Sequence, residues 1–318
     1  MDDAATPFPT PAELSDGVDR LLAEVHEAFT SDRWAILDSG RERAKWLVYD
    51  GAALRYCCQL LREMEVSAGL GLEFAVRTLG RAHMEAWLLS LYIHFGGYPA
   101  VVRVGQDARY SLEGLDREAK AFNEQLAEQK EAALRRTDKV RRANEGITRR
   151  NRERVAGTPE TPLLDVPHVP RLEPNIVDLS ALIAGFDPHA ARKLSVSEIV
   201  DTLTMWAPRL GFGNESFRPV YLIYRWLSTV GTHATMHILD SYVDYGTGKS
   251  WFVRIAPETT TGSAIDSTLA TTLYATAFAA EWVLSAQGCP TEVSSEIRTW
   301  LAPDPTGRSA WSPGTPAS

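Results

Sequence analysis

The stretch FAVRTLGRAHMEAWLLSLYI, residues 74–93, decides the fold predicted for this chain. Its run of apolar side chains predicts a long helix buried in the core. Four charged or titratable side chains lie within it: Arg77, Arg81, His83 and Glu85. Two arginines and the glutamate recur at every fourth residue, so they share one stripe of the helix. Because buried charges need partners, this stripe predicts an ion pair inside the fold.

Composition predicts a globular protein rather than a disordered one. The chain has 318 residues, of which 44% are hydrophobic and 23% are charged, enough for one large helical domain or two smaller ones. The formal net charge of -8 argues against nucleic-acid binding by the whole surface, although a local basic patch is compatible with it.

The cysteines and the amino terminus predict a cytoplasmic protein. Three cysteines, two of them adjacent, form no disulfide framework. The first residues are acidic and lack the basic and apolar segments of a secretory signal. The longest apolar run, 86–102, is interrupted by His94, two glycines and Pro99, so no membrane association is expected.

Helical periodicity elsewhere in the chain predicts an all-α fold, a helical bundle with a long projecting charged helix or helical hairpin. Helices are predicted over about 11–29, 41–66, 71–95, 176–184, 195–206, 216–245, 263–285 and 293–301, with at most one short strand near residue 251. The predicted segments are a flexible lead-in (1–12), the first part of the bundle (13–100), a charged helical arm (101–156), a proline-rich connection (157–175), the second part of the bundle (176–301) and a disordered tail (302–318).

The arm carries a heptad-like seam and a strong charge asymmetry. Steps of three and four residues link Leu112, Leu115, Ala119, Phe122, Leu126, Gln129, Ala133, Arg136, Val140, Ala143 and Ile147, a pattern typical of coiled coils and of a homodimer through the arm. Residues 130–154 contain ten Lys or Arg and four Asp or Glu, a net +6, whereas the rest of the chain carries -14.

This basic segment predicts a site for the phosphates of RNA or DNA, or for the acidic surface of a protein partner. A solvated helix without a partner is the simpler alternative. The candidate phosphate- or partner-binding residues are Arg135, Arg136, Lys139, Arg141, Arg142, Arg149 and Arg150.

Metal and cofactor chemistry find little support in the sequence. His233 and His237 share a helical face in the predicted 216–245 helix and are the candidate metal ligands. A third ligand would have to come from elsewhere, with Glu85 or Glu281 as the donor, so core histidines are favoured over a metal site. No phosphate-binding loop, nucleophile elbow or dinucleotide fingerprint is present, and no cofactor is expected.

Two helices carry a family resemblance. The pattern Arg77-x3-Arg81-x3-Glu85 followed by Tyr92, with Tyr224-x3-Ser228-x4-His233 on a later helix, resembles a group of uncharacterised bacterial HEPN-like helical proteins. The resemblance implies a bundle in which the first helix packs on the second, and it carries no agreed activity. HEPN ribonucleases use an arginine followed after four to six residues by a histidine, and Arg77-x5-His83 matches that spacing, as does Arg20-x5-His26.

Three functions therefore stay open. The first is a helical interaction or regulatory module that contacts nucleic acid through its basic arm. The sequence leaves open whether the chain is an enzyme. The second is a metal-independent ribonuclease or toxin of HEPN type, in which His83 or His233 acts as acid and base and Arg77 or Arg81 stabilises phosphate charge. The third is a metal-dependent helical-bundle enzyme using His233 and His237.

Overall fold

The computed structural model describes residues 8–30, 40–167, 169, 191–210, 217, 221–225, 227, 243–245, 251–253 and 263–301. The helices are α1 (Pro11–Thr30), α2 (Arg41–Gly69), α3 (Glu73–Arg152), α5 (Val196–Trp206), the 3-10 turn η2 (Ala207–Leu210), α8 (Ser263–Ala286) and α9 (Glu292–Trp300). Two short strands, β1 (Val243–Tyr245) and β2 (Trp251–Val253), form an antiparallel pair. The predicted all-α fold class is confirmed.

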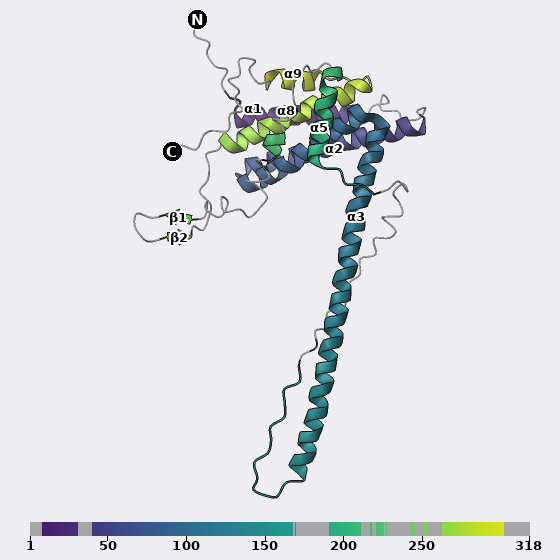
Figure 1. Cartoon of the computed structure of the whole chain (residues 1–318). Coiled ribbons are helices and arrows are strands. Elements are labelled where there is room, and N and C mark those ends of the chain that lie inside the picture. Colours follow the sequence, from purple (N-terminus) through teal and green to yellow (C-terminus); the bar gives the residue numbers. More distant parts are fainter. Residues whose placement is uncertain are drawn as a thin grey trace. The chain divides into compact units, whose positions relative to one another are not determined.

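The chain forms two compact units. The first comprises Met1–Arg103 and Leu194–Ser318, and the second comprises Val104–Lys193. In the first unit α8 packs against α1, α2 and α9, as the helices gathered around the α8 label in Figure 1 show. Helix α8 is rich in Ala and Thr, whose small side chains allow neighbouring helices to approach closely.

The threonines of α8 are buried without loss of hydrogen bonding. The Thr272 hydroxyl donates to the Thr268 carbonyl over 3.0 Å, and the Thr276 hydroxyl donates to the Thr272 carbonyl over 2.8 Å. Because a buried hydroxyl costs free energy unless it is bonded, these contacts allow a polar residue type to line the core. The prediction that residues 263–285 form a helix is confirmed.

Helix α1 begins where its sequence predicts. The Thr10 hydroxyl accepts a 3.3 Å hydrogen bond from the Glu13 backbone N–H, and the Glu13 carboxylate accepts one of 2.7 Å from the Thr10 N–H. This reciprocal capping satisfies two donors that the first helical turn would leave unpaired. The helix therefore starts at Pro11, inside the predicted lead-in over 1–12.

At Gly80 the backbone of α3 lies close to α8. A Cβ atom at this position would lie 2.8 Å from Cγ2 of Thr268, too near for an ordinary contact. We expect Gly80→Ala to lower the free energy of unfolding by about 1–2 kcal/mol, because the core must shift to admit the methyl group. Gly114→Ala in the same helix, where a Cβ meets nothing within 4 Å, is expected to raise it by about 0.5–1 kcal/mol through helix propensity.

Denaturant unfolding of the two single variants beside the parent chain measures this contrast. A similar change in both variants would contradict the close approach at Gly80.

Helix α3 contains a kink at the two glycines that were predicted to end it. Gly97 has φ 62° and ψ -151°, a backbone conformation that side chains with a Cβ rarely adopt. Helical structure resumes after it, and Pro99 lies in the first turn, where its missing N–H is not needed. The predicted end of the helix near residue 95 is thus a kink, and the arm is a single helix up to Arg152 rather than a hairpin.

The predicted helix over 216–245 is wrong at its carboxyl end. Val243–Tyr245 is a strand, with Val243 opposite Val253 and Tyr245 opposite Trp251, because β-branched and aromatic residues pair well across strands. Residues 221–225 are helical as predicted. His233 and His237, most of the 157–175 connection beyond residue 167, the 176–184 helix and the 302–318 tail lie outside the described residues.

No helix in the described part of the chain is both long enough and apolar enough to cross a membrane.

Candidate functional site

His83, the candidate acid or base of the 74–93 stretch, is completely buried against α8. Its Nε2 lies 2.7 Å from Oγ1 of Thr276, whose own proton is donated to the Thr272 carbonyl. Nε2 therefore carries the proton and donates it to the threonine oxygen. The Nδ1 atom is buried and has no hydrogen-bond partner among the described residues.

Burial also sets the charge state of His83. Loss of solvent lowers the pKa of the imidazole from 6.5 to about 3, so the ring is neutral at physiological pH. A histidine that exchanges protons with a substrate must reach it directly or through water. The structure instead places His83 in the core, and this placement does not favour the ribonuclease hypothesis.

The charged stripe of the same helix does not pair as predicted. Arg77 forms its ion pair with Glu73, one turn earlier, while Glu85 is exposed. Arg81 contacts Tyr224 instead: its Nη2 lies 3.4 Å from the Tyr224 hydroxyl, and its guanidinium lies 5.5 Å from the ring centroid. The structure therefore separates Arg81 from Glu85 and joins α3 to the 221–225 helix through an arginine–aromatic contact.

A buried polar pair that sequence analysis missed lies between α2 and α3. Nδ1 of His94 lies 2.9 Å from Oδ2 of Asp50, with 8% of the histidine side chain and none of the aspartate side chain exposed. Burial raises the pKa of Asp50, and the hydrogen bond from His94 opposes this rise. Oδ1 of Asp50 is buried and has no hydrogen-bond partner in the described part of the chain.

Aromatic rings enclose this pair. Trp46 lies 6.2 Å and Phe95 4.9 Å from the His94 ring, centroid to centroid. The indole N–H of Trp46 donates to the Ile93 carbonyl over 3.0 Å, which fixes the tryptophan against α3. These contacts fix the His94 ring, whose hydrogen bond to Asp50 makes the pair a structural element of the first unit.

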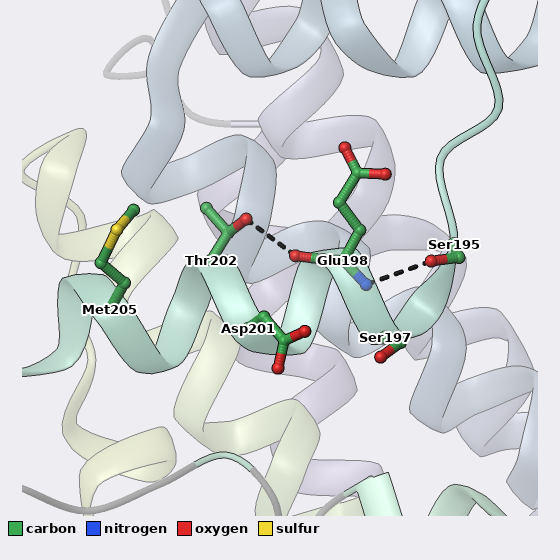
Figure 2. Close-up of a pocket in the computed structure, with 6 residues that line it drawn as sticks. All are labelled: Ser195, Ser197, Glu198, Asp201, Thr202 and Met205. Carbon is green, nitrogen blue, oxygen red and sulfur yellow. Dashed lines mark hydrogen bonds between the residues drawn. The ribbon is translucent and has the colours of Figure 1, made fainter.

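A hollow of about 400 Å³ runs along α5. Its described lining comes from this helix and its cap alone: Ser195, Ser197, Glu198, Asp201, Thr202 and Met205 (Figure 2). The Ser195 hydroxyl caps the helix by accepting from the Glu198 N–H, and the Thr202 hydroxyl donates to the Glu198 carbonyl. These lining residues include no histidine or cysteine, and the two hydroxyls for which hydrogen bonds are described, Ser195 and Thr202, bond to the backbone of Glu198.

Metal and thiol chemistry find no centre in the described residues. Among them, no three His, Cys, Asp or Glu side chains lie close enough to hold a metal ion. Cys57 and Cys58 are buried in α2, and burial raises the pKa of Cys58 to about 12, so neither thiol is available as a thiolate.

The seven basic candidates of the arm are all exposed on the second unit. At about 100° per residue, Arg135, Lys139, Arg142 and Arg149 fall on one face of α3, which we call the basic stripe, and Arg136 and Arg150 flank it. The structure thus brings together six of the seven residues predicted to bind phosphate, whereas Arg141 lies about 100° around the helix from Arg142 and pairs with Asp138.

Most charges of the basic stripe are available to a ligand. Arg135 pairs with Glu131 at 2.9 Å, but both side chains are more than half exposed, so this contact is weak. Lys139, Arg142 and Arg149 form no ion pair within the described part of the chain. Their charge is therefore not cancelled by the protein itself.

The residues of the predicted coiled-coil seam differ in how far they are buried. Ala119, Leu126, Ala133 and Val140 are partly buried and Ile147 is buried, whereas Leu115 and Phe122 are more than half exposed and Arg136 is exposed. The extended segment that follows α3 lies beside it (Figure 1), where Asn144 and Asn151 contact Leu164 and Thr161 of that segment. The homodimer through the arm stays a prediction.

Comparison of the chain with protein-family models, with curated proteins and with solved structures finds no match.

Proposed function

We propose that this chain is a helical interaction protein that binds nucleic acid through the basic stripe of α3. The observation that supports this is the exposure of four cations on one helical face, three of them without an ion pair in the described residues. Phosphate oxygens accept charge-assisted hydrogen bonds from such side chains. Arginine predominates here, and its planar guanidinium fits phosphate through two parallel bonds.

The distribution of charge favours this face over the rest of the surface. Residues 130–154 carry +6 and the remainder carries -14, so a polyanion is attracted to the stripe and repelled elsewhere. Binding of this kind is driven by release of counterions from the nucleic acid and depends steeply on salt. An acidic protein partner is the competing outcome of the test below.

The test compares a stripe variant with a control of the same charge. We expect the triple substitution Arg135→Gln, Arg142→Gln and Arg149→Gln to weaken binding of a labelled RNA or DNA oligonucleotide at least about tenfold. It should also reduce the slope of log K against log salt by about 2–3, one unit or less per lost phosphate contact. The matched control lowers the charge equally at exposed positions outside α3: Arg41→Gln, Arg43→Gln and Arg209→Gln.

Fluorescence anisotropy at several salt concentrations provides both quantities. Equal weakening by the two triple variants would show that net charge, not the stripe, attracts the ligand. If the parent chain binds no oligonucleotide even at about 50 mM salt, the proposal is wrong, and the stripe is then open to an acidic protein.

A further inference from the structure

Two asparagines of α3 each hold one residue of an extended segment by both of its main-chain groups. The Asn144 amide donates to the Leu164 carbonyl over 2.9 Å and accepts from the Leu164 N–H over 2.8 Å. Asn151 does the same for Thr161, over 2.9 and 3.1 Å. Such paired bonds copy the contact between neighbouring strands of a sheet, with a side-chain amide in place of one strand.

A third contact continues the series. The Thr137 hydroxyl lies 3.4 Å from the Pro167 carbonyl, and because it also donates its single proton to the Ala133 carbonyl over 3.0 Å, this contact is weaker than those of the asparagines. We call Thr137, Asn144 and Asn151 the amide ladder, and residues 159–167, which lie along them, the strap. The extended return of the chain beside α3 is visible in Figure 1.

The spacing of these contacts matches two regular structures. Ladder residues recur every seven positions of an α-helix, about 10.5 Å, and their partners recur every three positions of an extended chain, about 9.3 Å in the polyproline conformation. Pro159, Pro162 and Pro167 favour that conformation. None of the three prolines stands at a position whose N–H the ladder uses.

The ladder recognises the main chain of the strap and little else. The side chains of Leu163, Leu164 and Val166 remain 59%, 51% and 58% exposed, although they are large and apolar. The strap therefore gains little from burying apolar surface on α3. Its hydrogen bonds are exposed and largely replace bonds to water, so each contributes little net free energy. They therefore offset only weakly the conformational entropy that the strap loses when it is ordered.

We propose that the amide ladder is a binding site for an extended segment of a partner protein and that the strap is its exchangeable occupant. The ligand is defined by its backbone. It presents three carbonyls spaced by three residues and free N–H groups at the first two of these positions, and proline is accepted between them. Main-chain contacts of this kind supply affinity in other modes of extended-peptide recognition.

This inference is independent of the nucleic-acid proposal. The ladder and the basic stripe lie on different faces of α3: Asn144 is about 160° around the helix from Arg142 and about 140° from Arg149. Substitutions of one face therefore leave the other unchanged, and the two proposals can fail separately.

The experiment frees the ladder and offers it a peptide. In the full-length chain, Thr161→Pro with Leu164→Pro removes the two N–H groups that the asparagines use. A labelled peptide with the parent sequence of residues 158–167 is then titrated into this chain and into the parent. We expect binding to the substituted chain to be about tenfold tighter, because the tethered strap of the parent competes at a high effective concentration.

Three controls separate main-chain recognition from other causes. Adding Asn144→Leu and Asn151→Leu to the freed chain should abolish peptide binding, while circular dichroism confirms that the helix remains. A peptide with alanine at 163, 164 and 166 should bind within about twofold of the parent peptide, and one with proline at 161 and 164 should not bind.

Failure of the parent peptide to bind the freed chain at millimolar concentration would overturn the proposal and leave the ladder as an internal support for the strap. Binding that depends on the leucine side chains, or that persists without the asparagines, would overturn it equally.

Discussion

Replacing His94 with leucine is expected to lower the free energy of unfolding by about 3–5 kcal/mol at neutral pH. The substitution removes the hydrogen bond to Oδ2 of Asp50, and Oδ1 of that residue has no partner among the described residues. A fully buried carboxylate is then left without compensation. Chemical denaturation of the variant and the parent chain measures the loss.

A second variant isolates the charge from the loss of packing. Asp50→Asn combined with His94→Leu keeps the shape of the aspartate but removes its negative charge, so this double variant should be more stable than His94→Leu alone. If the double variant is the less stable of the two, the burial of an uncompensated carboxylate is not what destabilises the single variant.

His83 is expected to make the folded state sensitive to acid. Its folded pKa of about 3 lies below the ordinary value of 6.5, so folding favours the neutral ring. The stability that depends on this neutrality is present above pH 6.5 and decreases as the pH falls from 6.5 towards 3. Between pH 7.5 and pH 5 the loss amounts to about 2 kcal/mol.

His83→Gln tests this by removing the titrating ring while retaining a donor for Thr276. Its unfolding free energy should fall by about 2 kcal/mol less than that of the parent over the same pH interval. His26→Gln, at an exposed position of α1, is the matched control for losing an imidazole. Parallel pH profiles for the parent and the His83 variant would mean that the ring is open to solvent, which would restore it as a candidate acid or base.

The sequence predicted the elements whose evidence lies within a few consecutive turns. The apolar period of α1 and the Ala- and Thr-rich α8 were each recognisable because helix propensity and periodicity act locally. The strand at Val243–Tyr245 was missed because it has only three residues, too few to show an alternating pattern. Its pairing with β2 is a contact between separate segments, which periodicity does not detect.

Contacts between distant residues were beyond such reasoning. Asp50 and His94 are 44 positions apart, and neither position has a local signal for the other. Arg81 and Glu85 had the spacing of an ion pair, yet α3 turns one towards Tyr224 and leaves the other exposed. Periodicity predicts which residues share a face of a helix, but it does not predict which residues of other elements that face contacts.

The amide ladder was missed although its signal was present. The seam of the arm consists mostly of apolar positions, whereas Thr137, Asn144 and Asn151 form a separate polar series with the same period of seven. Small polar side chains that recur along the edge of an apolar seam are a pattern worth testing when a proline-rich segment follows the helix.

The two repeats of the ladder differ slightly in length, and this difference limits the ligand. Seven residues of α-helix, about 10.5 Å, exceed three residues of a polyproline chain, about 9.3 Å, by about 1.2 Å. Of the ladder contacts, the two asparagines hold theirs at 2.8–3.1 Å and Thr137 reaches 3.4 Å. A fourth contact would accumulate about 3.6 Å of offset, more than a hydrogen bond tolerates. The spacing of the ladder therefore limits its ligand to about seven residues of extended chain, because beyond that length the carbonyls of the ligand no longer lie opposite the ladder side chains.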